Sequence, residues 1–145
     1  MQVLIDANVF ISYLLHPGRT TAVVNVVEAG ILGDYTVLLP AKLRDDIAVV
    51  IRNKDYLARR ISPQQLDRLW EGLELRAKDI PEITEEIPPV TRDPKDDYLI
   101  AYALVGEADY LVSGDPDLQA LEQVESVRIM SPVEFWEILE GLVIG

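Results

Sequence analysis

Two acidic residues stand directly after apolar segments that are expected to be strands. Asp6 follows Val3-Leu4-Ile5, and Asp115 follows the segment 110–113 after one glycine. In open α/β sheets, ligands bind outside the carboxyl ends of the strands, near the point where the strand order reverses. Either aspartate alone is typical of a helix cap, because a helical segment follows it. Together at one sheet edge they favour a shared cation, since two carboxylates repel each other unless a metal ion or a proton lies between them.

A third acidic position lies at the start of an expected helix over residues 95–105. At 100° per residue, Leu99 and Ile100 belong to the apolar stripe of this helix, and Asp96 lies on the same side one turn earlier. Asp97 points further round the helix. Acids in a first turn are also favoured by the positive end of the helix dipole. The spacing therefore leaves open whether Asp96 or Asp97 reaches a metal ion.

The fourth candidate lies in an expected helix over residues 43–51. Asp46 borders the apolar stripe that contains Leu43 and Ile47, whereas Asp45 sits nearly opposite that stripe. Helical phase therefore selects Asp46. A solvated acid beside neighbouring basic side chains is an equally good interpretation when this segment is taken by itself.

This set of acids suits a hard divalent cation. The chain has no cysteine and one histidine, so its candidate ligands are carboxylate oxygens, which favour Mg²⁺ or Mn²⁺ over zinc. One or two such ions can activate a water molecule and stabilise the leaving oxygen during hydrolysis of a phosphodiester. The sequence therefore predicts Asp6, Asp46, Asp96 and Asp115 as metal ligands and catalytic residues, with Asp45 and Asp97 as alternatives.

Short apolar segments alternate with amphipathic ones along the chain. The expected strands are 3–5, 35–39, 110–113 and 127–130, and the expected helices are 8–15, 20–29, 43–51, 62–78, 95–105, 116–121 and 132–140. The segment 79–94 is expected to be a loop with one short strand. This alternation predicts an α/β fold with a parallel sheet covered by helices on both faces.

The composition limits which classes of protein this chain can belong to. The 145 residues, 49% of them hydrophobic, fit one globular domain over 1–145. The absence of cysteine suits a reducing cytoplasm, and neither a signal peptide nor an apolar stretch of the roughly 18–20 residues that a bilayer requires is expected. The net charge of −12 repels nucleic-acid phosphates, so binding them would need a local basic patch or bound cations.

Three segments resemble the signature motifs of the PIN-domain family. They are residues 4–12 (LIDANVFIS), 93–99 (DPKDDYL) and 108–115 (ADYLVSGD), in the family's order and spacing between residue 2 and about residue 121. Within that family the chain is similar to the VapC-like toxin components of toxin-antitoxin pairs. The resemblance implies a single three-layer, Rossmann-like PIN domain with a parallel central sheet. It also implies a ribonuclease that depends on Mg²⁺ or Mn²⁺.

The resemblance carries particular residues into the site. Asp6, Asp96 and Asp115 match the acids of the family, and Asn8 and Ser113 match polar positions that support its site. The helix acid of the family is usually Glu. Here that position holds an aspartate, one methylene shorter, so the match at residue 46 departs from the family pattern.

The distribution of basic residues bears on the substrate. Six of the 13 Lys and Arg residues lie between positions 42 and 60. We predict that Arg44, Arg52 and Lys54 bind RNA phosphates there. A solvated helix face is the alternative interpretation.

Two other functions compete with the ribonuclease. A phosphohydrolase of the haloacid-dehalogenase type also begins with an aspartate after a strand, but it needs a second aspartate at the position of Asn8. A catalytically weak binding module acting through a protein partner is the second alternative. The apolar C-terminal segment 135–144 could dock an antitoxin or a second copy, so a homodimer or higher homo-oligomer is expected.

Overall fold

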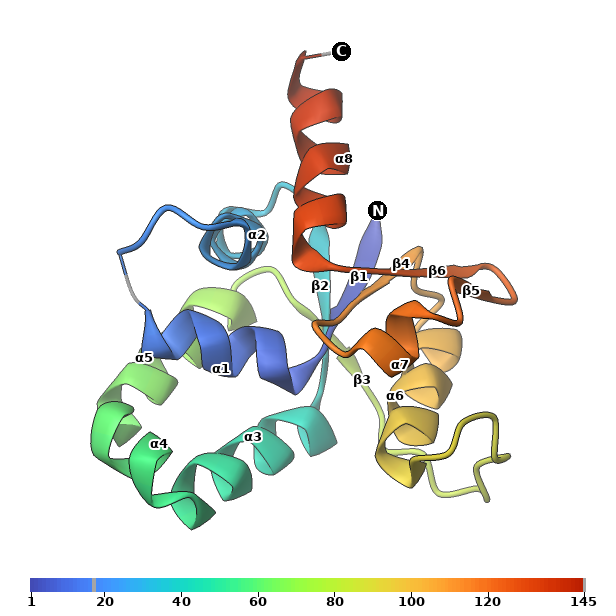
Figure 1. Cartoon of the computed structure of the whole chain (residues 1–145), viewed down its shortest axis with the longest axis horizontal. Coiled ribbons are helices and arrows are strands. Elements are labelled where there is room, and N and C mark those ends of the chain that lie inside the picture. The colour runs from blue at the N-terminus through green and yellow to red at the C-terminus, as the bar shows by residue number, and fades with distance from the viewer. Residues whose placement is uncertain (17, 145) are drawn as a thin grey trace.

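A six-stranded sheet forms the centre of the computed structural model, which describes residues 1–16 and 18–144 (Figure 1). Its strands, in chain order, are β1 (Gln2–Ile5), β2 (Thr36–Pro40), β3 (Lys78–Ile80), β4 (Tyr110–Val112), β5 (Gln123–Val124) and β6 (Val127–Met130). Their order across the sheet is β3-β2-β1-β4-β6-β5. β1, β2, β3, β4 and β6 are parallel, as predicted, but β5 runs antiparallel to β6. The sheet is therefore mixed, and the expectation of a purely parallel sheet was wrong.

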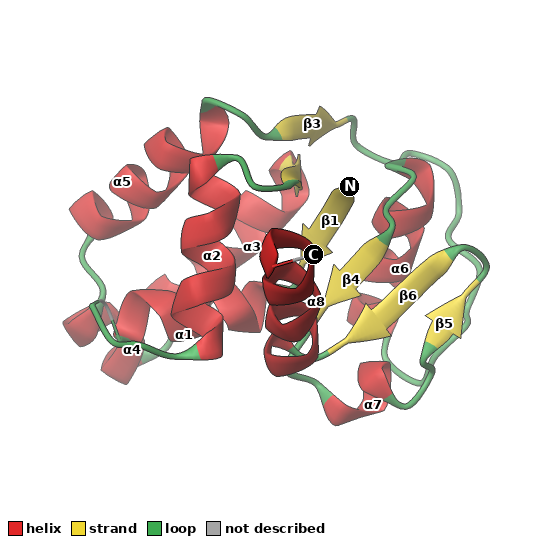
Figure 2. Cartoon of the chain, turned by 90° about the horizontal axis from the view of Figure 1, so that it is seen from above, coloured by secondary structure: helices red, strands yellow, loops and turns green. Residues whose placement is uncertain are grey.

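Helices lie on both sides of the sheet. They are α1 (Ala7–Leu15), α2 (Ala22–Leu32), α3 (Ala41–Asn53), α4 (Asp55–Arg60), α5 (Pro63–Glu74), α6 (Pro94–Val105), α7 (Pro116–Gln119) and α8 (Pro132–Ile144). Figures 1 and 2 show α1, α2, α3 and α5 gathered on one side, with α6 on the other and α8 beside α2. This is the layered α/β architecture that the alternating pattern predicted.

The sheet is buried because its strands are continuously apolar. Val3, Leu4 and Ile5 of β1 are completely buried, as is Leu111 of the neighbouring β4. A strand covered by helices on both faces has no solvent-facing side, so its residues do not alternate between apolar and polar. The same burial fixes where β1 and β4 end, and both ends are followed at once by polar residues.

Three segments differ from the sequence-based expectation. The helix expected over 62–78 ends at Glu74, because residues 78–80 pair with β2 as strand β3. Helix α4 and strand β5 were not expected at all. β5 is joined to β6 by a turn in which Glu125 has a positive φ of 53°, a conformation that usually calls for Gly or Asn, so the sequence carried no turn signal.

The strand order reverses next to β1. Successive strands β1, β2 and β3 proceed toward one edge, whereas β4 returns to the other side of β1 and β6 continues outward from it. The crevice outside the carboxyl ends of β1 and β4 is therefore the expected ligand site of this topology.

Candidate active site

Asp6 is the residue that follows β1, and its side chain turns toward β4. Its backbone N–H donates to the carbonyl of Val112 at 2.9 Å, which extends the pairing of the two strands by one residue. Its Oδ2 accepts hydrogen bonds from Ser113 Oγ at 2.6 Å and from Asn8 Nδ2 at 3.3 Å. The side chain makes no capping hydrogen bond to α1, although Asp6 is the N-cap residue. The carboxylate is thus held from two elements, by Ser113 after β4 and by the side chain of Asn8 in the first turn of α1.

Ser113, which is fully buried after β4, connects Asp6 to the loop that carries Asp115. Its hydroxyl donates to Asp6 and accepts from the backbone N–H of Asp115 at 3.0 Å. Gly114 N donates to Asn8 Oδ1 at 3.2 Å, which makes a second link between the two loops. Together these hydrogen bonds hold Asp6 and Asn8, which follow β1, against the loop after β4.

Asp115 also serves locally as a helix cap. Its Oδ1 accepts from the backbone N–H of Asp117 at 2.9 Å at the start of the short helix α7. This contact occupies one of its two carboxylate oxygens. The capping interpretation and the site interpretation therefore both apply to this residue.

Asp96 faces the same edge from the first turn of α6. Its pKa is raised from 3.8 to about 6, first because burial removes water from the carboxylate. The negative charges of Asp115, Asp93 and Asp6 raise it further, as does a hydrogen bond with the Asp115 carboxyl. Burial likewise raises the pKa of Asp6, against the hydrogen bond from Ser113, and the charge of Asp115 adds to that rise. Three acids distant in the chain are therefore electrostatically coupled at the end of β1 and β4.

Asp97 points elsewhere and has a structural task. It is buried, and its Oδ1 accepts from the backbone N–H groups of Val90 and Thr91 at 2.9 and 2.6 Å. Burial alone would raise the pKa of Asp97, but these hydrogen bonds lower it below its ordinary value. Asp97 thus fastens the segment before α6, and its neighbour Asp96 is the one whose charge belongs to the cluster.

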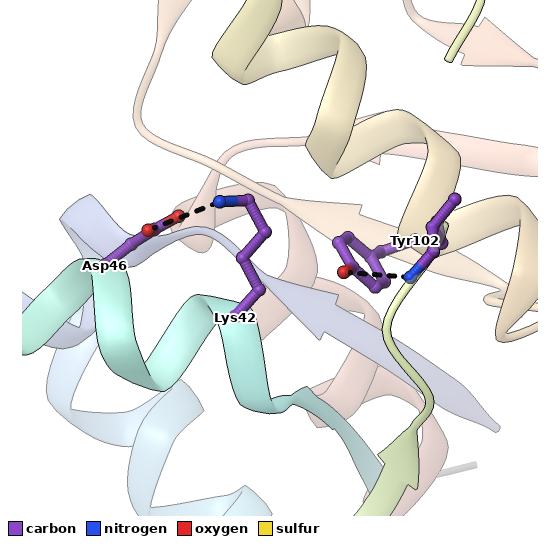
Figure 3. Close-up of polar contacts among 4 residues, drawn as sticks. Lys42, Asp46 and Tyr102 are labelled. Carbon is purple, nitrogen blue, oxygen red and sulfur yellow. Dashed lines mark hydrogen bonds and ion pairs between the residues drawn. The ribbon is translucent and has the colours of Figure 1, made fainter. Parts of the chain in front are cut away.

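Asp46 lies apart from the other three acids. Both Asp45 and Asp46 are exposed on α3, and Asp46 Oδ1 forms an ion pair with Lys42 Nζ at 3.7 Å (Figure 3). Lys42 Nζ also lies 4.9 Å from the ring centroid of Tyr98 on α6. Asp46 is therefore on the side of α3 that faces α6, but it is not among the charges that raise the pKa of Asp96.

The predicted basic residues fall into two groups. Arg44 forms an ion pair with Glu74 at 2.7 Å, and its guanidinium lies 5.3 Å from the ring centroid of Trp70. Arg52 and Lys54 are exposed at the far end of α3. Of the three, Arg52 and Lys54 are the ones whose surroundings leave them open to a phosphate.

One positioning residue was missed by the sequence reasoning. Gln119 Nε2 donates to the carbonyl of Ser113 at 2.7 Å, so helix α7 supports the loop that holds Asp6. Its spacing of six residues from Ser113 carries no recognised signal. Only the fold of the loop brings the two together.

The donor set fits a hard divalent cation in kind. Carboxylates of Asp6, Asp96 and Asp115 are the oxygen ligands that Mg²⁺ and Mn²⁺ prefer, and burial, with repulsion from neighbouring acids, raises the pKa of Asp6 and of Asp96. Within the described residues, no three His, Cys, Asp or Glu side chains are arranged to hold a metal ion as they stand. The site therefore has the chemistry of a metal centre without a preformed cage.

We expect Asp96→Asn to stabilise the metal-free protein at neutral pH. The pKa of Asp96 in the folded state is about 6, against 3.8 ordinarily, so the native state binds the proton more tightly than the unfolded state. The stability that this proton gives the parent is fully present below about pH 4 and is lost as pH rises through 6. The variant should therefore gain about 1 kcal/mol over the parent at pH 7.5, a value reduced for solvent screening of a partly exposed group. Urea unfolding in chelator at pH 4 and pH 7.5 measures the difference.

Asp97→Asn is the matched control, and its expected change in stability has the opposite sign. Because hydrogen bonds lower the pKa of Asp97, its ionised carboxylate stabilises the fold above the ordinary pKa of an aspartate, and this stabilisation is lost as pH falls. The variant should therefore be less stable than the parent at pH 7.5. Equal behaviour of the two variants would contradict the assignment of Asp96 to the charged cluster and of Asp97 to the loop.

The surface of the C-terminal helix bears on the expected partner. Leu142 and Val133 of α8 are 62% and 56% exposed. The side chains of residues 143–145, which belong to the predicted docking segment, lie outside the described ones. No helix in the part of the chain that the structure describes is long and apolar enough to cross a membrane.

Comparison with protein families gives a match over most of the chain. Residues 2–117 match the family described as PIN domain. The match spans β1 to α7 and so contains every element that contributes to the acidic cluster. None of the curated proteins compared with the chain matches it.

Proposed function

This chain belongs to the PIN-domain family, and from that premise we propose that it is a Mg²⁺- or Mn²⁺-dependent ribonuclease. PIN domains have a nuclease-type fold and are generally metal-dependent nucleases. The observation that carries the proposal is the coupling of Asp6, Asp96 and Asp115 at the carboxyl ends of β1 and β4. Crowded carboxylates at a topological switch point are what a cation-dependent phosphodiesterase requires.

In this proposal Asp6, Asp96 and Asp115 hold the cation. A bound divalent cation supplies activation of a water molecule and stabilisation of the charge on the phosphate oxygens. Water adds to phosphorus and the bond from phosphorus to the leaving sugar oxygen breaks. Ser113 and Asn8 orient the Asp6 carboxylate through their hydrogen bonds, and such supporting contacts typically change metal affinity or activity by about 10- to 100-fold.

Asn8 argues against the phosphohydrolase alternative. Its side-chain amide donates to Asp6 Oδ2 and accepts from Gly114 N, so it cannot act as the second acid of that chemistry. In the proposed site Asp6 would bind the metal ion and would form no covalent intermediate with the substrate.

Incubation with a mixed RNA substrate tests the proposal. Cleavage should require added Mg²⁺ or Mn²⁺ and should stop on chelation, and the Asp6→Asn chain purified in parallel controls for contaminating nuclease. Cleavage that persists in chelator, or no cleavage with either ion, would reject a metal-dependent ribonuclease. The second of these results would favour the binding module.

The toxin role, cytoplasmic location and antitoxin partner belong to the same proposal. They are supported by the resemblance of three motifs to VapC-like toxins and by exposed apolar residues on α8, which could contact an antitoxin or a second copy in a homodimer. Expression should arrest growth, and Asp6→Asn should relieve the arrest. An adjacent reading frame whose product restores growth would identify the antitoxin.

Asp46 and Asp45 form a matched pair that tests the fourth acid. We expect Asp46→Asn to lower kcat by about 10- to 100-fold, because Asp46 faces α6 and its loss removes a supporting carboxylate. Asp45→Asn, on another face of α3, should stay within about twofold of the parent. Steady-state cleavage assays measure both, and equal losses would remove Asp46 from the site.

A further inference from the structure

Resting on the proposed ribonuclease activity, we propose that Lys42 and Tyr98 bind single-stranded RNA beside the acidic cluster. In this arrangement a base stacks on the Tyr98 ring and Lys42 contacts a backbone phosphate. The two side chains come from different helices that flank the site, α3 and α6. Tyr98 was not part of the predicted site, and Lys42 lies in the predicted basic stretch 42–60 but was not among its three predicted RNA contacts.

The placement of the two residues carries the first step. Tyr98 lies on α6 two residues after Asp96, about 200° further round the helix, so the two side chains leave α6 in different directions. Lys42 lies in the first turn of α3, directly after β2. Lys42 Nζ is 4.9 Å from the centroid of the Tyr98 ring, so these side chains meet between the two helices. Figure 3 shows Lys42 reaching from α3 toward Asp46 on the side where α6 passes.

Exposure carries the second step. The Tyr98 residue is 40% exposed and the Lys42 side chain 38%, although the two are in contact. Tyr102, one turn later on the same helix, is only 3% exposed. The Lys42 ammonium lies over one face of the Tyr98 ring, so in this proposal a base stacks on the opposite face while the ammonium contacts a phosphate.

The contacts of Lys42 do not exclude a phosphate. Its ion pair with Asp46 is 3.7 Å long and joins two side chains that are 38% and 55% exposed. An exposed pair of this kind is weak in water. A phosphate, which carries a full negative charge and accepts several hydrogen bonds, can therefore replace Asp46 as the partner of Lys42.

Direct binding tests this inference separately from cleavage. The Asp6→Asn chain, which should leave RNA intact, is titrated with a single-stranded RNA oligonucleotide that carries 2-aminopurine, whose fluorescence falls when the base stacks. Adding Tyr98→Ala to this chain should weaken binding about tenfold or more and abolish the quenching, whereas Tyr98→Phe should retain both. Lys42→Ala should weaken binding and reduce the slope of log affinity against log salt by about 0.7. Val105→Ala, an exposed change at the other end of α6, is the control.

Kinetics on the otherwise unchanged chain add a second readout. Tyr98→Ala should raise KM by about tenfold and change kcat little, because stacking contributes equally to ground-state and transition-state binding. Equal RNA affinity of the Tyr98→Ala and parent chains, or no RNA binding by the parent, overturns the inference. If the unmodified chain cleaves RNA and Tyr98→Ala leaves KM unchanged, the inference falls and the ribonuclease proposal stands. If Tyr98→Ala weakens binding but no chain cleaves RNA, the ribonuclease proposal falls alone.

Discussion

Asp6→Asn is expected to reduce metal-dependent RNA cleavage by at least about a thousandfold, which corresponds to about 4 kcal/mol of lost transition-state stabilisation. An amide oxygen has no charge with which to hold a divalent cation, and Asp6 is the acid that both strands position through Val112 and Ser113. Initial rates of RNA cleavage at saturating Mg²⁺ or Mn²⁺ measure the effect.

The fold should survive this substitution. Burial raises the pKa of Asp6, so its charge costs stability in the metal-free protein, and a neutral side chain of the same shape removes that cost. Ser113 can still donate to the amide oxygen. Thermal unfolding should therefore show an unchanged or higher Tm for Asp6→Asn in chelator.

Two further variants test whether the loss of activity is specific to Asp6 and its hydrogen-bond partner. Ser113→Ala removes one hydrogen bond to Asp6 and should cost about 10- to 100-fold in activity. Asp67→Asn, an exposed acid on α5, should have no effect on cleavage. A chain with Asn at position 6 that retained more than a tenth of the activity would show that Asp6 is not a ligand of the catalytic cation.

Much of this site could be placed from sequence because strand ends and helical phase are local properties. Asp6 and Asp115 follow short apolar segments, and helical phase placed Asp96 on the apolar side of α6, although the spacing left open whether Asp96 or Asp97 would reach a metal ion. The structure then gives each a different environment: a charged cluster for Asp96 and two backbone N–H groups for Asp97. The second environment depends on the path of residues 90–93, which no periodicity describes.

Contacts between distant elements could not be predicted in the same way. The approach of Lys42 to Tyr98 depends on how α3 and α6 flank the sheet, and the packing of Arg44 on Trp70 depends on where α5 returns. Nothing in the sequence indicated that Arg44, a predicted phosphate contact, would form an ion pair with Glu74 in the fold. Strand β3 also ended a helix that its own residues could have continued, because pairing with β2 outweighed local preference.

Phe10 links the hydrophobic core to the site. It lies on α1 one turn after Asp6, is completely buried, and packs edge-on against Trp70 with ring centroids 5.9 Å apart and an interplanar angle of 70°. The side chain of Asp6 is held by hydrogen bonds to the loop after β4, not by Phe10. A substitution at Phe10 should therefore lower stability with little effect on catalysis, whereas a substitution at Asp6 should do the reverse.

We expect Phe10→Ala to lower the free energy of unfolding by about 3–5 kcal/mol, because it removes a buried ring and leaves a cavity against Trp70. Since domains of this kind are stable by only about 5–15 kcal/mol, urea denaturation should show a large loss. Phe10→Leu, which fills part of the space, should cost roughly 1–2 kcal/mol, and Leu75→Ala, at a 79% exposed position, less than about 0.5 kcal/mol. At low temperature the folded fraction of Phe10→Ala should keep kcat within about threefold of the parent, in contrast to Asp6→Asn. A kcat loss as large as that of Asp6→Asn would mean that the core, and not the bonds from Ser113 and Asn8, positions the carboxylate.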